Sequence, residues 1–236
     1  MKVALAFWGL TRSLKYTIGS INKKILNVLK KHNIEYKIFM HAWTINSVYN
    51  NTRSKEANIK LDNEEYKLLN PDYFETHDQD EFKKNINLKA FRTHKDPWNT
   101  KYETVNNFIC AMFSKSKCTQ LIRKSNENFD YIIFLRPDCM YLTNLDISFL
   151  KLANNNTICI PNFALYNNFN DRFCITNMST YQLYGNVFSK LFMYSKIFPI
   201  HSETFHYNII KQHKINIKLI NFQFRRVRAN GAIVDK

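Results

Sequence analysis

The chain has 236 residues, of which 45% are hydrophobic and 15% aromatic, so it can bury a sizeable core and is not a disordered protein. Its formal net charge of +15 attracts nucleic acid, anionic membranes or phosphorylated small molecules, while its four glycines exclude a Walker loop and a glycine-rich dinucleotide fingerprint. Five scattered cysteines without a Cys-x-x-Cys pair, no apolar run near ~18 residues and no convincing signal peptide predict a cytoplasmic protein without a transmembrane segment.

The first elements follow a strand–helix–strand pattern. Lys2–Trp8 is an apolar run that ends at Gly9, where the chain can turn sharply. Lys15–His32 carries apolar residues at helical spacing, and Glu35–His41 returns as a second strand. Such a unit is a right-handed crossover between parallel strands. Residues 43–60 are polar and without periodicity, which predicts a loop.

The alternation of strands and helices continues to the end of the sequence. The predicted helices are Asp62–Leu69, Asp80–Ala90, Thr100–Lys124, Thr180–Leu191 and Glu203–Gln212, and the predicted strands are Tyr131–Leu135, Thr157–Ile160, Ile215–Ile220 and Phe222–Val227. This order is typical of an α/β fold with a mostly parallel sheet. No linker, repeat or low-complexity tract divides the chain, so we predict one domain over residues 1–236.

The segment 129–141 is the most informative in the sequence. Its aromatic and β-branched run must stop at Pro137, which cannot donate to a sheet ladder. Arg136 and Asp138 therefore stand at the carboxyl end of a buried strand, the edge where open α/β sheets bind ligands. A cation beside a carboxylate suits a substrate that carries phosphates and a divalent metal. The alternative is an ion pair that only closes the turn.

Phe7, Trp8, Gly9 and Arg12 end the first strand on the same predicted edge. Glycine permits close backbone approach, an aromatic ring stacks on a base, and an arginine forks onto a diphosphate. For Phe7 and Trp8, ordinary core packing is the alternative.

Three further polar residues have the same predicted location. His41 ends the second strand and would touch a ribose or phosphate, or else be a structural histidine. Asp171 lies in a loop after a strand, where a general base or a ligand of an acceptor hydroxyl is expected, although a salt bridge with Arg172 is the alternative. Glu203 begins a helix, where an acidic residue also complements the helix dipole.

The basic residues are mostly dispersed in short groups that fit solvated helix faces. The densest cluster is Arg225, Arg226 and Arg228, on a late strand. These arginines would face phosphate, or form a charged edge that discourages pairing between sheets.

Five short motifs, taken in order along most of the chain, resemble a family of small nucleotide-diphospho-sugar glycosyltransferases of large DNA viruses and bacterial surface-polysaccharide clusters. They are Gly9–Arg12, Phe39–Trp43, Phe134–Tyr141, Asn170–Phe173 and Ser202–Glu203. The resemblance implies a GT-A-like, Rossmann-like sandwich in which helices flank a mostly parallel, mixed central sheet.

The resemblance also implies a function, the transfer of a hexose or pentose from a nucleoside-diphosphate sugar to a hydroxyl of a glycan, glycoprotein or glycolipid. We expect the catalytic residues to be Asp171 and Glu203. We expect the donor to be bound by Phe7, Trp8, Gly9, Arg12, His41, Arg136, Asp138 and Tyr141.

A divalent metal, Mn²⁺ or Mg²⁺, is the cofactor that this resemblance implies, with Arg-Pro-Asp in the place of the family's metal-binding Asp-x-Asp. Position 140 is methionine, so Asp138 is the one carboxylate of the triplet. Such cations are coordinated by several oxygen ligands, so the donor diphosphate and water would have to supply the others. The alternative is that Arg12, Arg136 and the late arginines neutralise the leaving diphosphate.

Two other functions fit parts of the sequence. A non-catalytic basic protein would hold nucleic acid or an anionic surface, and a nucleotidyl- or phosphotransferase would use the same phosphate-binding arginines. No helix-turn-helix, RNA-recognition or zinc-finger signature is present, so we expect no specific nucleic-acid partner. Peripheral contact with a membrane remains compatible with the charge.

Overall fold

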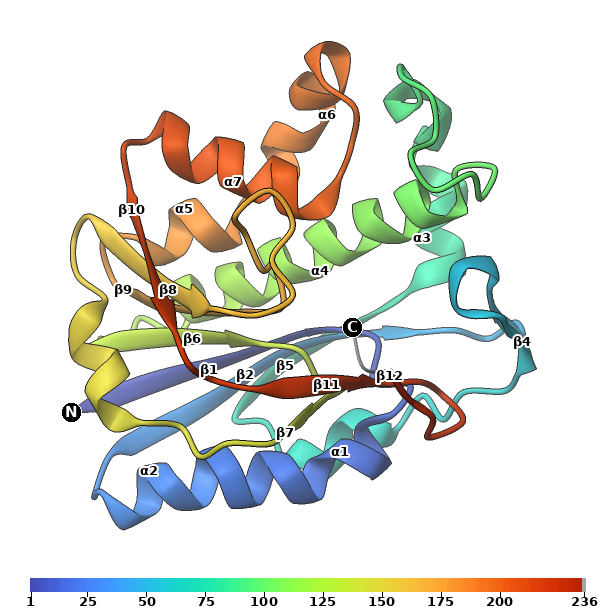
Figure 1. Ribbon diagram of the computed structural model, residues 1–236. Helices are drawn as coiled ribbons and strands as arrows, with labels where there is room; N and C mark the ends of the chain where they lie inside the picture. Colours follow the sequence, from blue (N-terminus) through green and yellow to red (C-terminus); the bar gives the residue numbers. More distant parts are fainter. Residues whose placement is uncertain (235–236) are drawn as a thin grey trace.

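A seven-stranded sheet forms the centre of the computed structural model, which describes residues 1–234 (Figure 1). Its strands lie in the order β10 (Asn216–Ile220), β8 (Thr157–Pro161), β9 (Phe173–Asn177), β6 (Tyr131–Leu135), β1 (Lys2–Gly9), β2 (Glu35–Thr44) and β5 (Tyr73–Asp78). Neighbours are parallel except at β9, which is antiparallel to both β6 and β8. The predicted α/β class with a mostly parallel, mixed sheet is therefore confirmed.

Helices cover both faces of this sheet. Figure 1 shows one layer below it, made of α1 (Leu14–Ile21) and α2 (Asn27–Lys31), which a π-helical turn η1 (Asn22–Leu26) joins into one segment. The layer above it contains α4 (Glu103–Lys124), α5 (Tyr181–Gly185), α6 (Phe188–Ile197) and α7 (Ser202–Gln212). The predicted helices at 15–32, 100–124 and 203–212 are confirmed to within a few residues.

The alternation of side chains along β1 shows how the two layers share the core. Leu5 and Phe7 belong to the hydrophobic cluster on the α1 side, whereas Ala6 and Trp8 belong to the cluster that includes α4. Successive side chains of a strand point to opposite faces, so a central parallel strand is apolar throughout. This alternation later decides which side chains reach the functional site.

The carboxyl ends of β1 and β6 meet where the chain reverses its direction of winding. From β1 the chain crosses through α1 and α2 to β2, and from β5 it crosses back through α4 to β6, on the other side of β1. Phe7 of β1 pairs with Leu135 of β6. In open α/β sheets such a switch point leaves a crevice at the carboxyl ends of the strands.

Small elements wall this crevice. A second sheet joins β7 (Cys139–Tyr141) to β11 (Phe224–Val227) and β12 (Ile233–Val234), all antiparallel. A hairpin pairs β3 (Tyr49–Asn51) with β4 (Glu56–Ile59). The remaining elements are α3 (Gln79–Asn85) and the 3₁₀ turns η2 (Thr52–Ser54), η3 (Glu65–Leu69), η4 (Leu88–Phe91) and η5 (Ile147–Leu152).

Several predictions from the sequence are wrong in detail. Residues 43–60 are not a loop, because β2 runs on to Thr44 and the β3–β4 hairpin follows. The predicted helix Thr180–Leu191 is interrupted at Asn186, and Asp62–Leu69 is a 3₁₀ turn. Within residues 1–234, none of the helices combines the length and the apolar character that crossing a membrane requires.

Candidate functional site

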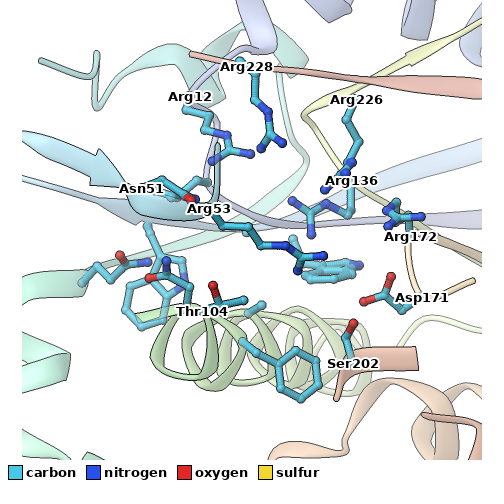
Figure 2. Close-up of a pocket in the computed structure, with 18 of the residues that line it drawn as sticks. Arg12, Asn51, Arg53, Thr104, Arg136, Asp171, Arg172, Ser202, Arg226 and Arg228 are labelled. Atoms are coloured by element: carbon cyan, nitrogen blue, oxygen red, sulfur yellow. The ribbon is translucent and has the colours of Figure 1, made fainter. Parts of the chain in front are cut away.

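A cavity of about 190 Å³ opens at the switch point between β1 and β6 (Figure 2). Figure 2 shows Arg12, Arg136, Arg226 and Arg228 reaching in from one side, with Thr104 of α4 on the other. The walls come from the end of β1, the β3–β4 hairpin, α4, the segment before β9, the start of α7, and β11 with the residue after it.

Arginines dominate the cavity. Among residues 1–234, six arginines line it against two carboxylates, those of Asp171 and Glu203; the arginines are Arg12, Arg53, Arg136, Arg172, Arg226 and Arg228. Burial, and then the neighbouring cations Arg172 and Arg228, lower the pKa of Arg226 to about 10. Like charges gathered in a buried site without equal opposite charge are the signature of a binding site for a polyanion.

Asp138 holds two of these arginines in position. Nε and Nη2 of Arg136 donate to its two carboxylate oxygens over 2.7 and 2.6 Å, and Nη2 of Arg12 donates over 3.2 Å. Burial alone would raise the pKa of Asp138, but Arg136 and Arg12 hold it well below its usual value. Its role in the structure is to orient guanidinium groups, since the residue is only 1% exposed and does not line the cavity.

A second buried carboxylate extends this network. Glu56 of β4 lies 3.6 Å from Arg12 and 3.8 Å from Arg228, and its other oxygen accepts a hydrogen bond from the backbone N–H of Ala229. Arg12 also donates to the hydroxyl of Tyr49. The hairpin therefore fixes the arginines of the first and the last part of the chain against each other.

Asp138 does not provide a divalent cation with a suitable donor set. Both of its oxygens accept hydrogen bonds from arginines, and residue 140 is a methionine. In the part of the chain that the structure describes, no group of three or more His, Cys, Asp or Glu side chains is arranged to hold a metal ion. Mn²⁺ and Mg²⁺ need several oxygen ligands with free lone pairs, so the residues around Asp138 do not fit them.

The two carboxylates in the cavity differ in their partners. Glu203 accepts hydrogen bonds from Nη2 of Arg172, 3.4 Å away, and from the hydroxyl of Ser202. The carboxylate of Asp171 makes no hydrogen bond or ion pair with any residue in the range 1–234, and Figure 2 shows it beside Arg172 at the cavity. Asp171 is therefore the carboxylate that is open to a ligand.

The pKa values of these two carboxylates are pushed apart. Burial would raise the pKa of Asp171, but Arg172 and the other surrounding cations lower it overall. Burial and the charge of Asp171 raise the pKa of Glu203. The ionised form of Asp171 is therefore favoured, whereas Glu203 is the more easily protonated of the two acids.

Aromatic rings and unused donors complete the site. The ring of Trp8 lies 5.3 Å from the guanidinium of Arg136, and the rings of Trp43 and Trp98 also line the cavity. Within residues 1–234, Nε1 of Trp8 and Nε of Arg12 are buried without a hydrogen-bond partner. Buried donors in a native protein are almost always satisfied, so these two are unusual features of the cavity wall.

Six of the residues predicted from the sequence line this cavity: Trp8, Gly9, Arg12, Arg136, Asp171 and Glu203. Besides Asp138, three others lie elsewhere. Phe7 is buried in the core on the α1 side. His41 lies behind the cavity, where its ring nitrogens contact Ser114 and His77 over 2.7 and 3.0 Å. Tyr141 stacks on Phe222 with ring centroids 5.4 Å apart. Strand alternation turns Phe7 away from the cavity, and Tyr141 is likewise buried in the core on the α1 side. His41 shares the sheet face of Trp8 and Trp43, but α4 covers its ring.

The prediction from the sequence missed part of the lining, notably Tyr49, Arg53 and Trp98. These residues come from the hairpin and from the segment before α4, which had no periodic signal. The late arginines were recognised, and alternation along β11 explains which ones matter: Arg226 and Arg228 line the cavity, while Arg225 does not.

Comparisons with known proteins give loose likenesses. No family model matches the sequence, and no curated protein matches it. The galactosyltransferase LgtC, solved with donor and acceptor sugar analogues, is 10% identical to this chain with a TM-score of 0.45. The match covers 94% of this chain and 73% of the LgtC chain. Mouse xyloside xylosyltransferase 1 is 12% identical with a TM-score of 0.46, and the match covers 93% of this chain and 85% of the mouse chain.

A third solved structure, the glycosyltransferase GlyE of Streptococcus pneumoniae, is 12% identical with a TM-score of 0.41. The match covers 92% of this chain and 45% of the GlyE chain. All three TM-scores are below 0.5, so we base no functional conclusion on these likenesses.

Proposed function

We propose that this protein is a glycosyltransferase that moves a sugar from a nucleoside-diphosphate sugar to a hydroxyl of a glycan, glycoprotein or glycolipid. One observation carries the proposal: six arginines and an unbonded, ionised carboxylate, Asp171, converge in one aromatic-lined cavity at the switch point of the sheet. A nucleotide sugar presents the matching chemistry, because it combines a diphosphate, a flat base and a sugar.

Each part of such a donor has suitable partners. Arg226 and Arg228 bring guanidinium groups to the diphosphate, and Arg12 and Arg136, which already donate to Asp138 and Tyr49, add positive charge beside them. The indole of Trp98, which is only partly buried, offers an apolar surface to the base or the sugar. The acceptor hydroxyl then approaches from the side of Asp171, which is also the side of Arg172 and Ser202 (Figure 2).

In the transfer step, Asp171 takes the proton of the acceptor hydroxyl while the oxygen of that hydroxyl bonds to the anomeric carbon of the sugar. The bond between that carbon and the β-phosphate oxygen breaks, and its electron pair stays on the phosphate. The leaving nucleoside diphosphate thus gains one negative charge. Fixed guanidinium groups stabilise that charge without reorganisation, which is the largest contribution such a site can make.

Binding to a panel of nucleotides tests the proposal. We expect one nucleoside diphosphate among UDP, GDP and CDP to raise the melting temperature and to give a binding isotherm, with the nucleoside alone binding far more weakly. Arg226→Gln should weaken binding about tenfold or more, roughly 1.4 kcal/mol. Arg225→Gln, the neighbouring arginine outside the cavity, is the matched control and should change the affinity less than twofold.

Product analysis separates the proposal from its alternatives. Incubation with nucleotide sugars and a mixed glycan acceptor should release nucleoside diphosphate, and Asp171→Asn should lower the rate by about 10²–10⁴-fold while donor binding is retained. Release of pyrophosphate or a nucleoside monophosphate would identify a nucleotidyl- or phosphotransferase. If no nucleotide binds and duplex or single-stranded nucleic acid binds in a salt-sensitive manner, the protein is a basic binding protein instead.

A further inference from the structure

The cavity contains more fixed positive charge than a site built around a divalent cation requires. We infer that its arginines do the work of the metal: they bind the diphosphate of the donor and stabilise its departure, so the reaction needs no Mn²⁺ or Mg²⁺. This inference rests on the proposed function and adds to it the means by which the leaving group is stabilised.

The geometry of Asp138 is the first argument. A cation bound there would have to displace three hydrogen bonds from Arg136 and Arg12, of 2.6 to 3.2 Å, at a residue that is 1% exposed. Hydrogen bonds between ionised groups are the strong ones, and two buried guanidinium groups would lose their shared counter-ion. The carboxylate is thus committed to the arginines and cannot also serve a metal.

The balance of charge is the second argument. Among residues 1–234, the six arginines of the cavity exceed by two the four carboxylates that line or brace it, Asp171, Glu203, Asp138 and Glu56. The diphosphate of a nucleotide sugar carries about two negative charges and would be attracted to this arginine-rich lining. A divalent cation would add two positive charges to the same lining. Lys115, buried behind Trp8, adds to this excess when it is protonated.

The unused donors are the third argument. Nε of Arg12 and Nε1 of Trp8 are buried without partners in the described chain, and both residues line the cavity. An N–H group repels a metal ion and attracts a phosphate oxygen. When the bond between the sugar and the β-phosphate breaks, its electron pair and the third negative charge arrive on phosphate oxygens in a cavity whose lining is rich in N–H donors.

Titration calorimetry with UDP, GDP and CDP tests this inference on the whole protein. Each titration is run in EDTA, in Mn²⁺ and in Mg²⁺ at constant ionic strength. We expect the nucleotide that binds to give a Kd in EDTA within threefold of its Kd in Mn²⁺. Binding that appears only with the metal would overturn the inference and leave the glycosyltransferase proposal standing. Absence of binding under every condition would overturn both.

Two further measurements separate arginine from metal chemistry. In electron paramagnetic resonance, protein plus nucleotide should reduce the signal intensity of free Mn²⁺ no more than nucleotide alone does. In EDTA, Arg228→Gln and Arg226→Gln should each weaken nucleotide binding at least tenfold, with Arg225→Gln as the unchanged control, and Mn²⁺ should not restore the loss. A further loss of the free Mn²⁺ signal in the presence of the protein would contradict the inference. So would recovery of nucleotide binding by these variants when Mn²⁺ is added.

Discussion

Replacing Asp138 with asparagine keeps the shape of the side chain and removes one negative charge from the centre of the arginine network. In the wild type this carboxylate is 1% exposed and accepts three hydrogen bonds, two from Arg136 and one from Arg12. The asparagine would direct an amide N–H₂ group at one of the guanidinium groups. Arg136 would then lose its counter-ion, and Arg12 would keep only Glu56, 3.6 Å away.

Breaking a buried ion pair from one side costs about 3–5 kcal/mol. For a chain of this length each kcal/mol corresponds to about 2–4 °C, so the melting temperature of Asp138→Asn should fall by about 10 °C. Because the folded state holds the pKa of Asp138 below its ordinary value of 3.8, this stabilisation is fully present above about pH 4. This stabilisation is lost as the pH falls further, so the difference in unfolding free energy between wild type and variant should become smaller in acid.

Urea unfolding followed by circular dichroism at pH 7 and in acid measures these differences. The matched control is Asp146→Asn, an exposed residue whose carboxylate accepts from the N–H of Ser148 at 2.8 Å and caps a 3₁₀ turn. Asparagine caps about as well as aspartate, so the control should change stability by less than about 0.5 kcal/mol. If Asp138→Asn lost less than 1 kcal/mol at pH 7, the account of Asp138 as the brace of the arginines would be refuted.

Two other predictions concern buried positions near the cavity. Burial lowers the pKa of Lys115 from 10.5 to about 7, so the folded protein releases this proton before the unfolded chain does and stability rises with pH above that value. Relative to Lys115→Met, the wild type should therefore gain about 2 kcal/mol between pH 6 and 8.5 in urea unfolding, and parallel curves would contradict a buried, titrating amine. A methyl group on Gly185 would lie 2.0 Å from Oγ1 of Thr119 and 2.7 Å from the ring of Phe134, so Gly185→Ala should lose about 1–3 kcal/mol. Gly19→Ala, in an exposed helix position with open space, should instead gain about 0.5–1 kcal/mol, and equal effects at both sites would argue against the clash.

Hydrophobic patterning was sufficient to predict the centre of the fold. β1 and β6 are continuous apolar runs, and α4 repeats apolar residues at helical spacing, so their burial is visible in the sequence. β5 escaped prediction because it lies at the sheet edge, where none of its residues is fully buried, and because its last four residues, Glu75 to Asp78, are all polar. The hairpin at 49–59 is short and polar, and its contacts with Arg12 and Ala229 hold it more than its own propensity does.

The candidate site could be predicted as far as the rule for strand ends reaches. That rule located Arg12 and Arg136 correctly, because each follows directly on a central strand. It also selected Phe7, His41 and Tyr141, which strand alternation or a neighbouring helix buries behind the cavity. Arg53 and Trp98 stand on segments whose positions depend on tertiary contacts, so no local pattern could indicate them.

The arginines of the cavity are far apart in the sequence, and this spacing bears on how the protein is synthesised. Arg12 and Arg136 can dock on Asp138 once the first 138 residues have folded, whereas Arg226 and Arg228 are made about 90 residues later. At typical translation rates that delay is roughly 5–20 s. The sheet edge therefore forms around a satisfied carboxylate, and mutual repulsion arises only when β11 arrives. The order of the chain thus postpones the least favourable electrostatic step until the core is complete to resist it.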